Sequence, residues 1–193
     1  MRLFVALAVP DEVREKISAL LSQFKIADSR PRWVSAGNLH ITLKFIGNVL
    51  PEALDPVCDA LTRVRIAEPV HMEFSGLGFF PNARKPEVAW IGTKFSPNLP
   101  ALATAINNEL APLGILREEK PFVPHLTIAR FKHTRPSRAL LAIIEKAADM
   151  SFGTLTGREF LLIESKVRST GAQYTTIRSF PFVPEQREGK DSC

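Results

Sequence analysis

Hydrophobic residues recur along this chain with two different periods, which separate strands from helices. Alternating or continuous apolar runs predict strands at residues 2–8, 39–46, 69–80, 86–95, 123–131, 158–168 and 172–180, with a short extended piece at 32–34. Apolar residues spaced three and four apart predict helices at about 11–27, 51–64, 99–112 and 136–148. Mixed runs of this kind are typical of an α+β protein.

The predicted elements divide into two halves of similar content. Each half holds about two helices and one of the two strands 39–46 and 123–131. We therefore expect a bilobal fold of two pseudo-symmetric lobes, with antiparallel sheets lining a central groove and helices outside. Residues 1–183 are expected to form this single domain, and residues 184–193 a polar C-terminal tail.

Composition places the chain among soluble globular proteins. It has 193 residues, 45% of them hydrophobic, and no apolar run reaches the roughly 20 residues needed to cross a bilayer. Its two cysteines, Cys58 and Cys193, make neither a disulfide framework nor a zinc-finger spacing. We expect a cytoplasmic monomer with no membrane partner. The net charge of +5 favours an anionic partner such as a nucleotide or RNA.

One short pattern occurs twice. Residues 38–45 read Asn-Leu-His-Ile-Thr-Leu-Lys-Phe, and residues 123–130 read Val-Pro-His-Leu-Thr-Ile-Ala-Arg. In both copies a threonine follows a histidine by two positions, between apolar neighbours. Successive side chains of a strand point to opposite faces. Each copy therefore places its histidine and threonine side by side on one face and its apolar residues on the other.

The repeated pairs, His40 with Thr42 and His125 with Thr127, suit acid–base chemistry on a phosphate. Histidine changes charge near neutral pH and can act as either acid or base. Hydrolysis of a phosphodiester needs one group of each kind, on opposite sides of phosphorus. Threonine hydroxyls can donate hydrogen bonds to the non-bridging oxygens. The alternative is that these are half-buried strand residues selected for β propensity.

Residues 38–47 and 124–130 closely resemble the two signature motifs of the two-histidine (2H) phosphoesterases. Within that superfamily the chain resembles the RNA 2′,3′-cyclic phosphodiesterases, long called 2′-5′ RNA ligases. The resemblance covers about residues 2–182. It also includes Arg2–Ala6, Trp33-Val34, Gly78–Pro81, Ala89–Gly92 and the closing pattern Ser165, Gly171, Tyr174 and Phe180.

This resemblance implies a bilobal fold with a positively charged groove, and opening of a 2′,3′-cyclic phosphate at an RNA end to leave a 2′-phosphate. By position, His40 would be the proton donor and His125 the proton acceptor. Thr42 and Thr127 would hold the phosphate, and Arg130 would add a cationic contact. No cofactor or metal is implied. The substrate would be an RNA end or a small cyclic nucleotide, and reversible 2′-5′ ligation stays open.

Strand parity bears on two cations in the motifs. Arg130 lies an odd number of residues from His125, so an ideal strand would turn it away from the site. It reaches the phosphate only if the strand bulges or ends before it. Lys44 has the parity of His40, so it either lines the groove or is an exposed lysine at the strand end.

Other candidate residues carry weaker signals. His71 and His133 lack a threonine partner and are expected at the surface. Trp33, Phe79 and Phe80 are expected in the core, with nucleobase stacking as the alternative. Tyr174, the only tyrosine, would offer a groove-facing hydroxyl.

Two further functions are open alternatives. One is a module of the same fold that binds RNA or nucleotides without turnover. The other is a zinc hydrolase with the two motif histidines as ligands, although no third ligand or His-Glu-x-x-His pattern is evident.

Overall fold

The computed structural model describes residues 1–118, 121–132, 134–169 and 171–182. Its helices are α1 (Asp11–Ala27), α2 (Leu54–Thr62), α3 (Asn98–Leu110) and α4 (Arg138–Lys146), with 3₁₀ turns at Ala36–Asn38, Pro51–Ala53 and Ala111–Leu113. Its strands are β1 (Arg2–Ala8), β2 (Arg32–Trp33), β3 (His40–Asn48), β4 (Val70–Phe80), β5 (Val88–Phe95), β6 (Leu126–Arg130), β7 (Ser151–Gly157), β8 (Glu159–Arg168) and β9 (Gly171–Pro181).

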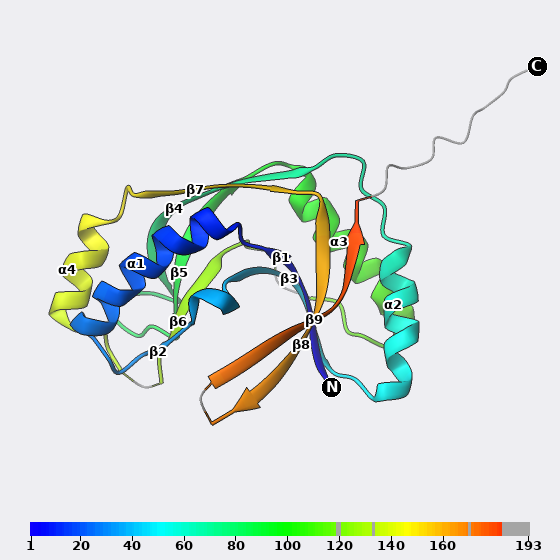
Figure 1. Cartoon of the computed structure of the whole chain (residues 1–193), viewed down its shortest axis with the longest axis horizontal. Coiled ribbons are helices and arrows are strands. Elements are labelled where there is room, and N and C mark those ends of the chain that lie inside the picture. The colour runs from blue at the N-terminus through cyan, green and yellow to red at the C-terminus, as the bar shows by residue number, and fades with distance from the viewer. Residues whose placement is uncertain (119–120, 133, 170, 183–193) are drawn as a thin grey trace, which may run out of the picture.

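The strands form one antiparallel sheet in the order β7-β4-β5-β6-β3-β1-β8-β9, with β2 paired to β6. The sheet has two four-stranded halves that join where β6 meets β3, through the single residue pair Ile41 and Leu126. Helices α1 and α4 pack beside the half that contains β7, and α2 and α3 beside the half that contains β3 (Figure 1). The α+β, bilobal expectation is confirmed.

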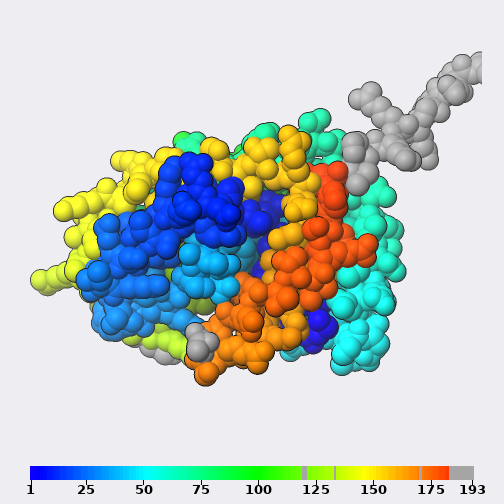
Figure 2. Space-filling model, in the orientation of Figure 1, coloured from blue at the N-terminus to red at the C-terminus, as the bar shows by residue number. Residues whose placement is uncertain are grey.

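The lobes do not coincide with the two halves of the sequence. Strand β1 pairs with β3 and β8, whereas helix α1, which follows it directly, packs on β7 of the other lobe. The chain therefore crosses between the lobes within its first 27 residues. Helix α1 and the β8–β9 hairpin, from opposite lobes, lie on the same face of the molecule (Figure 2).

Strand β1 is buried on both sides, which explains its continuous apolar run. Leu3, Val5 and Leu7 belong to the main core beneath the helices. Phe4 and Ala6 point to the opposite face of the sheet, where they form a second, smaller cluster with Ile163 of β8.

Strand β7 is absent from the sequence expectation, which places no element at residues 151–157. Its sequence contains Gly153 and Gly157, and glycine weakens a strand signal. Gly153 has φ +116°, at a register irregularity opposite Phe74 of β4. Pairing along β4 and burial of Phe152 and Leu155 stabilise this strand.

Asp28 links the end of α1 to the start of α4. Its buried carboxylate accepts two hydrogen bonds of 2.8 Å from the Arg30 guanidinium and one of 2.7 Å from the Ser137 backbone N–H. The Ser137 hydroxyl in turn accepts from the N–H of Leu140 and caps α4. The Arg30 hydrogen bond is the main reason that the pKa of Asp28 falls from 3.8 to about 2.

We expect Asp28→Asn to lower the free energy of unfolding by about 2 kcal/mol at neutral pH, because a buried charge-assisted hydrogen-bond set is lost. The folded-state pKa lies below the unfolded value, so the wild-type advantage is complete above pH 3.8 and disappears as pH falls through about 2. Urea unfolding at several pH values measures this. Asp11→Asn, at an exposed carboxylate of the same helix, is the control and should have little effect. An equal loss in both variants would contradict the role given to Asp28.

Candidate active site

The two repeated motifs meet at the seam between the lobes. Ile41 of β3 pairs with Leu126 of β6, and both are fully buried in the core. Each of these residues stands between the histidine and the threonine of its own motif. Because side chains alternate along a strand, the two histidines and two threonines share the opposite, groove face. All four are half-buried. The predicted pairing of the motifs across one groove is thus present.

The antiparallel register sets which of these side chains are neighbours. With Ile41 opposite Leu126, His40 lies beside Thr127, and Thr42 lies beside His125. Each histidine therefore has a threonine of its own strand and one of the neighbouring strand on the same face. A group placed over the seam is approached by a histidine and a threonine from each lobe.

Both histidine rings are held in the same way. Nδ1 of His40 lies 2.7 Å from the carbonyl oxygen of Asn38, and Nδ1 of His125 lies 2.8 Å from that of Val123. A carbonyl oxygen only accepts hydrogen bonds, so Nδ1 carries the hydrogen in both rings. Nε2 of each ring is left for the groove. Asn38 is itself fixed, because its side-chain amide donates to the carbonyl of Ala172 in β9.

Aromatic side chains fix each imidazole from the side. The His40 ring lies 4.7 Å from the ring of Phe4 and 5.3 Å from that of Tyr174, which meets it edge-on. The His125 ring lies 5.0 Å from Phe80, also edge-on. Tyr174 is therefore a neighbour of His40.

Burial lowers the pKa of His40 below its ordinary value of 6.5. The positive charges of Arg130 and His125 lower it further, against the opposing effect of the Asn38 carbonyl. Arg130 is thus close enough to His40 for its charge to act across the seam. In the free protein the neutral form of His40 is favoured.

A bulge in β6 resolves the parity problem of Arg130. Thr127 pairs with Trp90 of β5, whereas Arg130 pairs with Val88, so Ile128 is an extra residue in this strand. Trp90 and Val88 are two apart on β5 and point to the same face. Thr127 and Arg130 consequently share the groove face, and Arg130 is exposed there.

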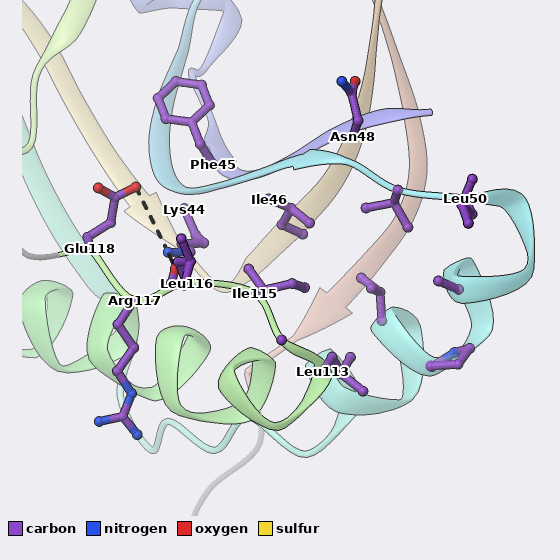
Figure 3. Close-up of a pocket in the computed structure, with 15 residues that line it drawn as sticks. Lys44, Phe45, Ile46, Asn48, Leu50, Leu113, Ile115, Leu116, Arg117 and Glu118 are labelled. Atoms are coloured by element: carbon purple, nitrogen blue, oxygen red, sulfur yellow. Dashed lines mark hydrogen bonds and ion pairs between the residues drawn. The ribbon is translucent and has the colours of Figure 1, made fainter.

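Strand β3 has the same bulge at the equivalent position, Leu43. Thr42 and Lys44 pair with consecutive residues of β1, so the face of the strand changes between them. Lys44 is only 3% exposed, and its Nζ donates to the Leu116 carbonyl and lies 3.9 Å from Glu118. The expectation that Lys44 lines the groove or lies exposed at the strand end is wrong. The bulge turns its side chain under the loop that contains Leu116 and Glu118 (Figure 3).

Phe45 is a groove residue that the sequence reasoning did not identify. It follows the β3 bulge as Arg130 follows the β6 bulge, and each stands five positions after its histidine. Phe45 pairs with Phe4 and is 51% exposed, and it points away from Lys44 (Figure 3). The equal spacing of five residues from the histidine in both motif copies is the sequence signal that could have identified Phe45.

Several other candidates lie away from the seam. Trp33 packs 5.6 Å from Phe24 and donates its indole N–H to the carbonyl of Asp28, and Phe79 packs edge-on against Phe131. Both have the structural role expected of them.

His71 is exposed, as expected, and its Nδ1 lies 3.2 Å from the hydroxyl of Thr156. His133 lies outside the described residues. Within residues 1–118, 121–132, 134–169 and 171–182, no three His, Cys, Asp or Glu side chains group as metal ligands would. Nor does any helix in these ranges have the length and apolar character needed to cross a membrane.

Comparison with known proteins agrees with this geometry. The LigT-like phosphoesterase family matches residues 7–90 and again residues 93–174. The chain is 38% identical over 180 residues to an RNA 2′,3′-cyclic phosphodiesterase of Archaeoglobus fulgidus, covering 93% of this chain and 99% of the relative. A Methanocaldococcus jannaschii protein of the same name is 33% identical, covering 93% and 100%.

Solved structures give the same result. The crystal structure of TT0787 of Thermus thermophilus superposes with a TM-score of 0.80 at 27% identity, covering 96% of this chain and 100% of that one. Escherichia coli LigT complexed with 3′-AMP has a TM-score of 0.72 at 27% identity, covering 94% and 97%. In sequence and fold, this chain belongs to the LigT-like phosphoesterase family.

Proposed function

We propose that this protein is an RNA 2′,3′-cyclic phosphodiesterase that opens the cyclic phosphate at an RNA end and leaves a 2′-phosphate. The observation that carries the proposal is the pair of histidines at the seam, each with Nδ1 bound to a backbone carbonyl and Nε2 left for the groove. The relatives from A. fulgidus and M. jannaschii, which this chain matches over nearly their whole length, are named for this activity.

In the proposed reaction, His125 takes a proton from water through Nε2, and the oxygen of that water attacks phosphorus. The bond from phosphorus to O3′ breaks, and His40 gives its Nε2 proton to O3′ as the 3′-hydroxyl forms. The product keeps the phosphate on O2′. The two histidines come from opposite lobes, which suits an in-line displacement, where the acid and the base stand on opposite sides of phosphorus. With the 5′-hydroxyl of a second RNA end in place of water, the same two proton transfers would join the ends through a 2′-5′ linkage.

Thr42, Thr127 and Arg130 are proposed to hold the non-bridging phosphate oxygens. The hydroxyls stand beside the histidines, and the guanidinium follows the β6 bulge onto the same face. Donors fixed in advance stabilise the charge that develops on these oxygens in the transition state. Since both lobes supply groups, we propose that residues 1–183 act as one domain. The tail at residues 184–193 lies outside the described residues.

The lowered pKa of His40 predicts a specific pH dependence. His40 must be protonated to act as the acid, and its pKa lies below 6.5 in the free protein. An anionic phosphate between the histidines favours the charged form and raises that pKa. We therefore expect kcat/KM to fall with rising pH through a lower apparent pKa than kcat does. If kcat/KM and kcat both fell with rising pH through the same apparent pKa above 6.5, this assignment would be contradicted.

Turnover with a chelator present tests the proposal against its alternatives. The protein is incubated with an RNA ending in a 2′,3′-cyclic phosphate, in the presence and absence of EDTA, and the products are identified. We expect equal rates and a 2′-phosphate. Loss of activity in EDTA, restored by Zn²⁺, would favour the zinc hydrolase. Binding without any product would favour a module that binds but does not turn over. A 3′-phosphate would contradict the proposed bond cleavage.

A further inference from the structure

Two arginines stand directly opposite each other at one end of the seam. Arg32 of β2 pairs with Arg130 of β6, and paired residues of antiparallel strands point to the same face. Since Arg130 is on the groove face, Arg32 is on that face as well. The next residue of β2 agrees with this orientation, because Trp33 points the other way and packs against Phe24 in the main core.

Arg32 holds the groove position that follows His40 along the seam. Strand β5 pairs with one edge of β6, so β3 and β2 both pair with the other edge. His40 lies beside Thr127 there, and the next groove position of β6 is Arg130, beyond the bulge. Arg32, opposite Arg130, therefore stands about 7 Å further along the seam than His40, which is the rise of two strand residues.

The charges of the two arginines are not balanced by neighbouring carboxylates. Like charges directly opposite each other destabilise a pair of strands. In the part of the chain that the structure describes, neither Arg32 nor Arg130 takes part in an ion pair. Asp28, four residues before Arg32, binds Arg30 and the Ser137 backbone instead. An anion held between the two guanidinium groups would relieve their repulsion.

This end of the seam is strongly basic. Residues 30–32 contain two Lys or Arg side chains, residues 84–87 two and residues 130–135 three, against one acidic side chain, Glu87. The three segments are joined by hydrogen bonds and strand pairing. Arg30 donates to the carbonyl of Arg135, and the Phe131 N–H donates to that of Glu87. Such a concentration of positive charge attracts a polyanion.

The opposite end of the seam is apolar. Phe45 is the groove residue there, and it borders an open cavity in which Leu113 and Leu116 are also exposed (Figure 3). The exposed charges of that cavity, Arg117 and Glu118, have opposite signs. An RNA strand that leaves the histidine pair is therefore attracted to the arginine end and not to this one.

We propose that Arg32 binds the phosphodiester that joins the terminal nucleotide to the rest of the RNA, so that an RNA end is preferred over a cyclic mononucleotide. The inference rests on the proposed function, in which O3′ leaves toward His40 and the terminal nucleoside consequently lies on the His40 side of the seam. The 5′-phosphate of this nucleoside is one sugar away from the cyclic phosphate, as Arg32 is one groove position away from His40. The preceding nucleotides then pass over the basic segments.

The kinetic test compares substrates with and without this phosphodiester. Arg32→Gln should lower kcat/KM about tenfold for an adenosine dinucleotide ending in a 2′,3′-cyclic phosphate, since one charge-assisted contact is lost. It should change kcat/KM little for adenosine 2′,3′-cyclic phosphate, which has no 5′-phosphate. Arg65→Gln, at an exposed arginine that follows α2, is the control and should match wild type on both. An equal loss on both substrates, or no loss on the dinucleotide, would overturn the proposal.

A neutral linkage isolates the contact with the phosphate. In the same dinucleotide, a methylphosphonate replaces one charged oxygen of the internucleotide phosphate with a methyl group. Wild type should lose about tenfold in kcat/KM on this replacement. Arg32→Gln should lose little, because it has no cation at this position. An equal loss in both proteins would show that another group binds this phosphate, and would overturn the assignment to Arg32.

A binding test separates this inference from the catalytic proposal. Calorimetry compares adenosine 2′-phosphate with the adenosine dinucleotide that carries the same terminal 2′-phosphate. Wild type should bind the dinucleotide about tenfold more tightly, and Arg32→Gln should lose most of this advantage. The slope of log Kd against log salt concentration for the dinucleotide should also fall by about 0.7 in the variant. An advantage that persists in Arg32→Gln would overturn the inference even with normal turnover, and its loss there would support the inference even without turnover.

Discussion

Replacing either His40 or His125 with alanine is expected to lower kcat/KM for opening a 2′,3′-cyclic phosphate by about a thousandfold or more. Each variant loses one of the two proton transfers, and a positioned acid or base contributes about 10²–10⁴-fold. The rings lie on the groove face and contribute little to the main core, so both variants should remain folded. Initial rates and circular dichroism on the same preparations measure the two effects.

His71→Ala is the matched control, because this exposed histidine lies on β4 and its imidazole bonds only to Thr156 among the described residues. It should keep the wild-type rate. Alanine at Thr42 or Thr127 should reduce the rate less severely than loss of a histidine, since each removes one neutral donor. Normal turnover by either His40→Ala or His125→Ala would be incompatible with two-histidine catalysis.

Arg130→Gln is expected to lower kcat about a hundredfold. The substitution removes a positive charge from the groove face beside the phosphate, where fixed charge counts most in the transition state. It should also raise the pKa of His40, because the charge of Arg130 is one of the causes that lower it. Kinetics and an NMR titration of the His40 ring give two independent readings.

Arg63→Gln is the control for Arg130, because Arg63 follows α2 and pairs with Glu109 of α3, on the helical side of the sheet. Neither kcat nor the His40 pKa should change in it. If Arg130→Gln lost activity but left the His40 titration unmoved, the placement of Arg130 at the seam would be wrong.

The sequence predicted the shared face of the motif pairs because each histidine and threonine brackets a core residue. Ile41 and Leu126 are fully buried, which leaves one face for the polar pairs. The alternation of side chains between the two faces of the strand fails three positions after each histidine. One extra residue there reverses the face to which the following side chains point. Nothing in the local composition of Leu43 or Ile128 marks a bulge, because both are ordinary strand residues.

The consequences of these bulges were therefore beyond sequence reasoning. Lys44 has the parity of a groove residue and is buried on the other side, whereas Arg130 has the wrong parity and reaches the groove. Equal bulges in both lobes indicate that the local twofold symmetry extends to the irregularities of the strands. The missed strand β7 has a different cause: its glycines weaken the local signal, and its pairing with β4 is a long-range contact.

The central claim is that His40 protonates the leaving oxygen and His125 activates water. A 2′,3′-cyclic substrate with sulfur in place of O3′ tests it, because a thiolate leaves without needing a proton. The measurement is the rate of ring opening of this substrate by wild type and by the two histidine variants. We predict that His40→Ala recovers most of the wild-type rate on it and that His125→Ala does not. Recovery by His125→Ala instead would reverse the roles, and recovery by neither would contradict acid catalysis by His40.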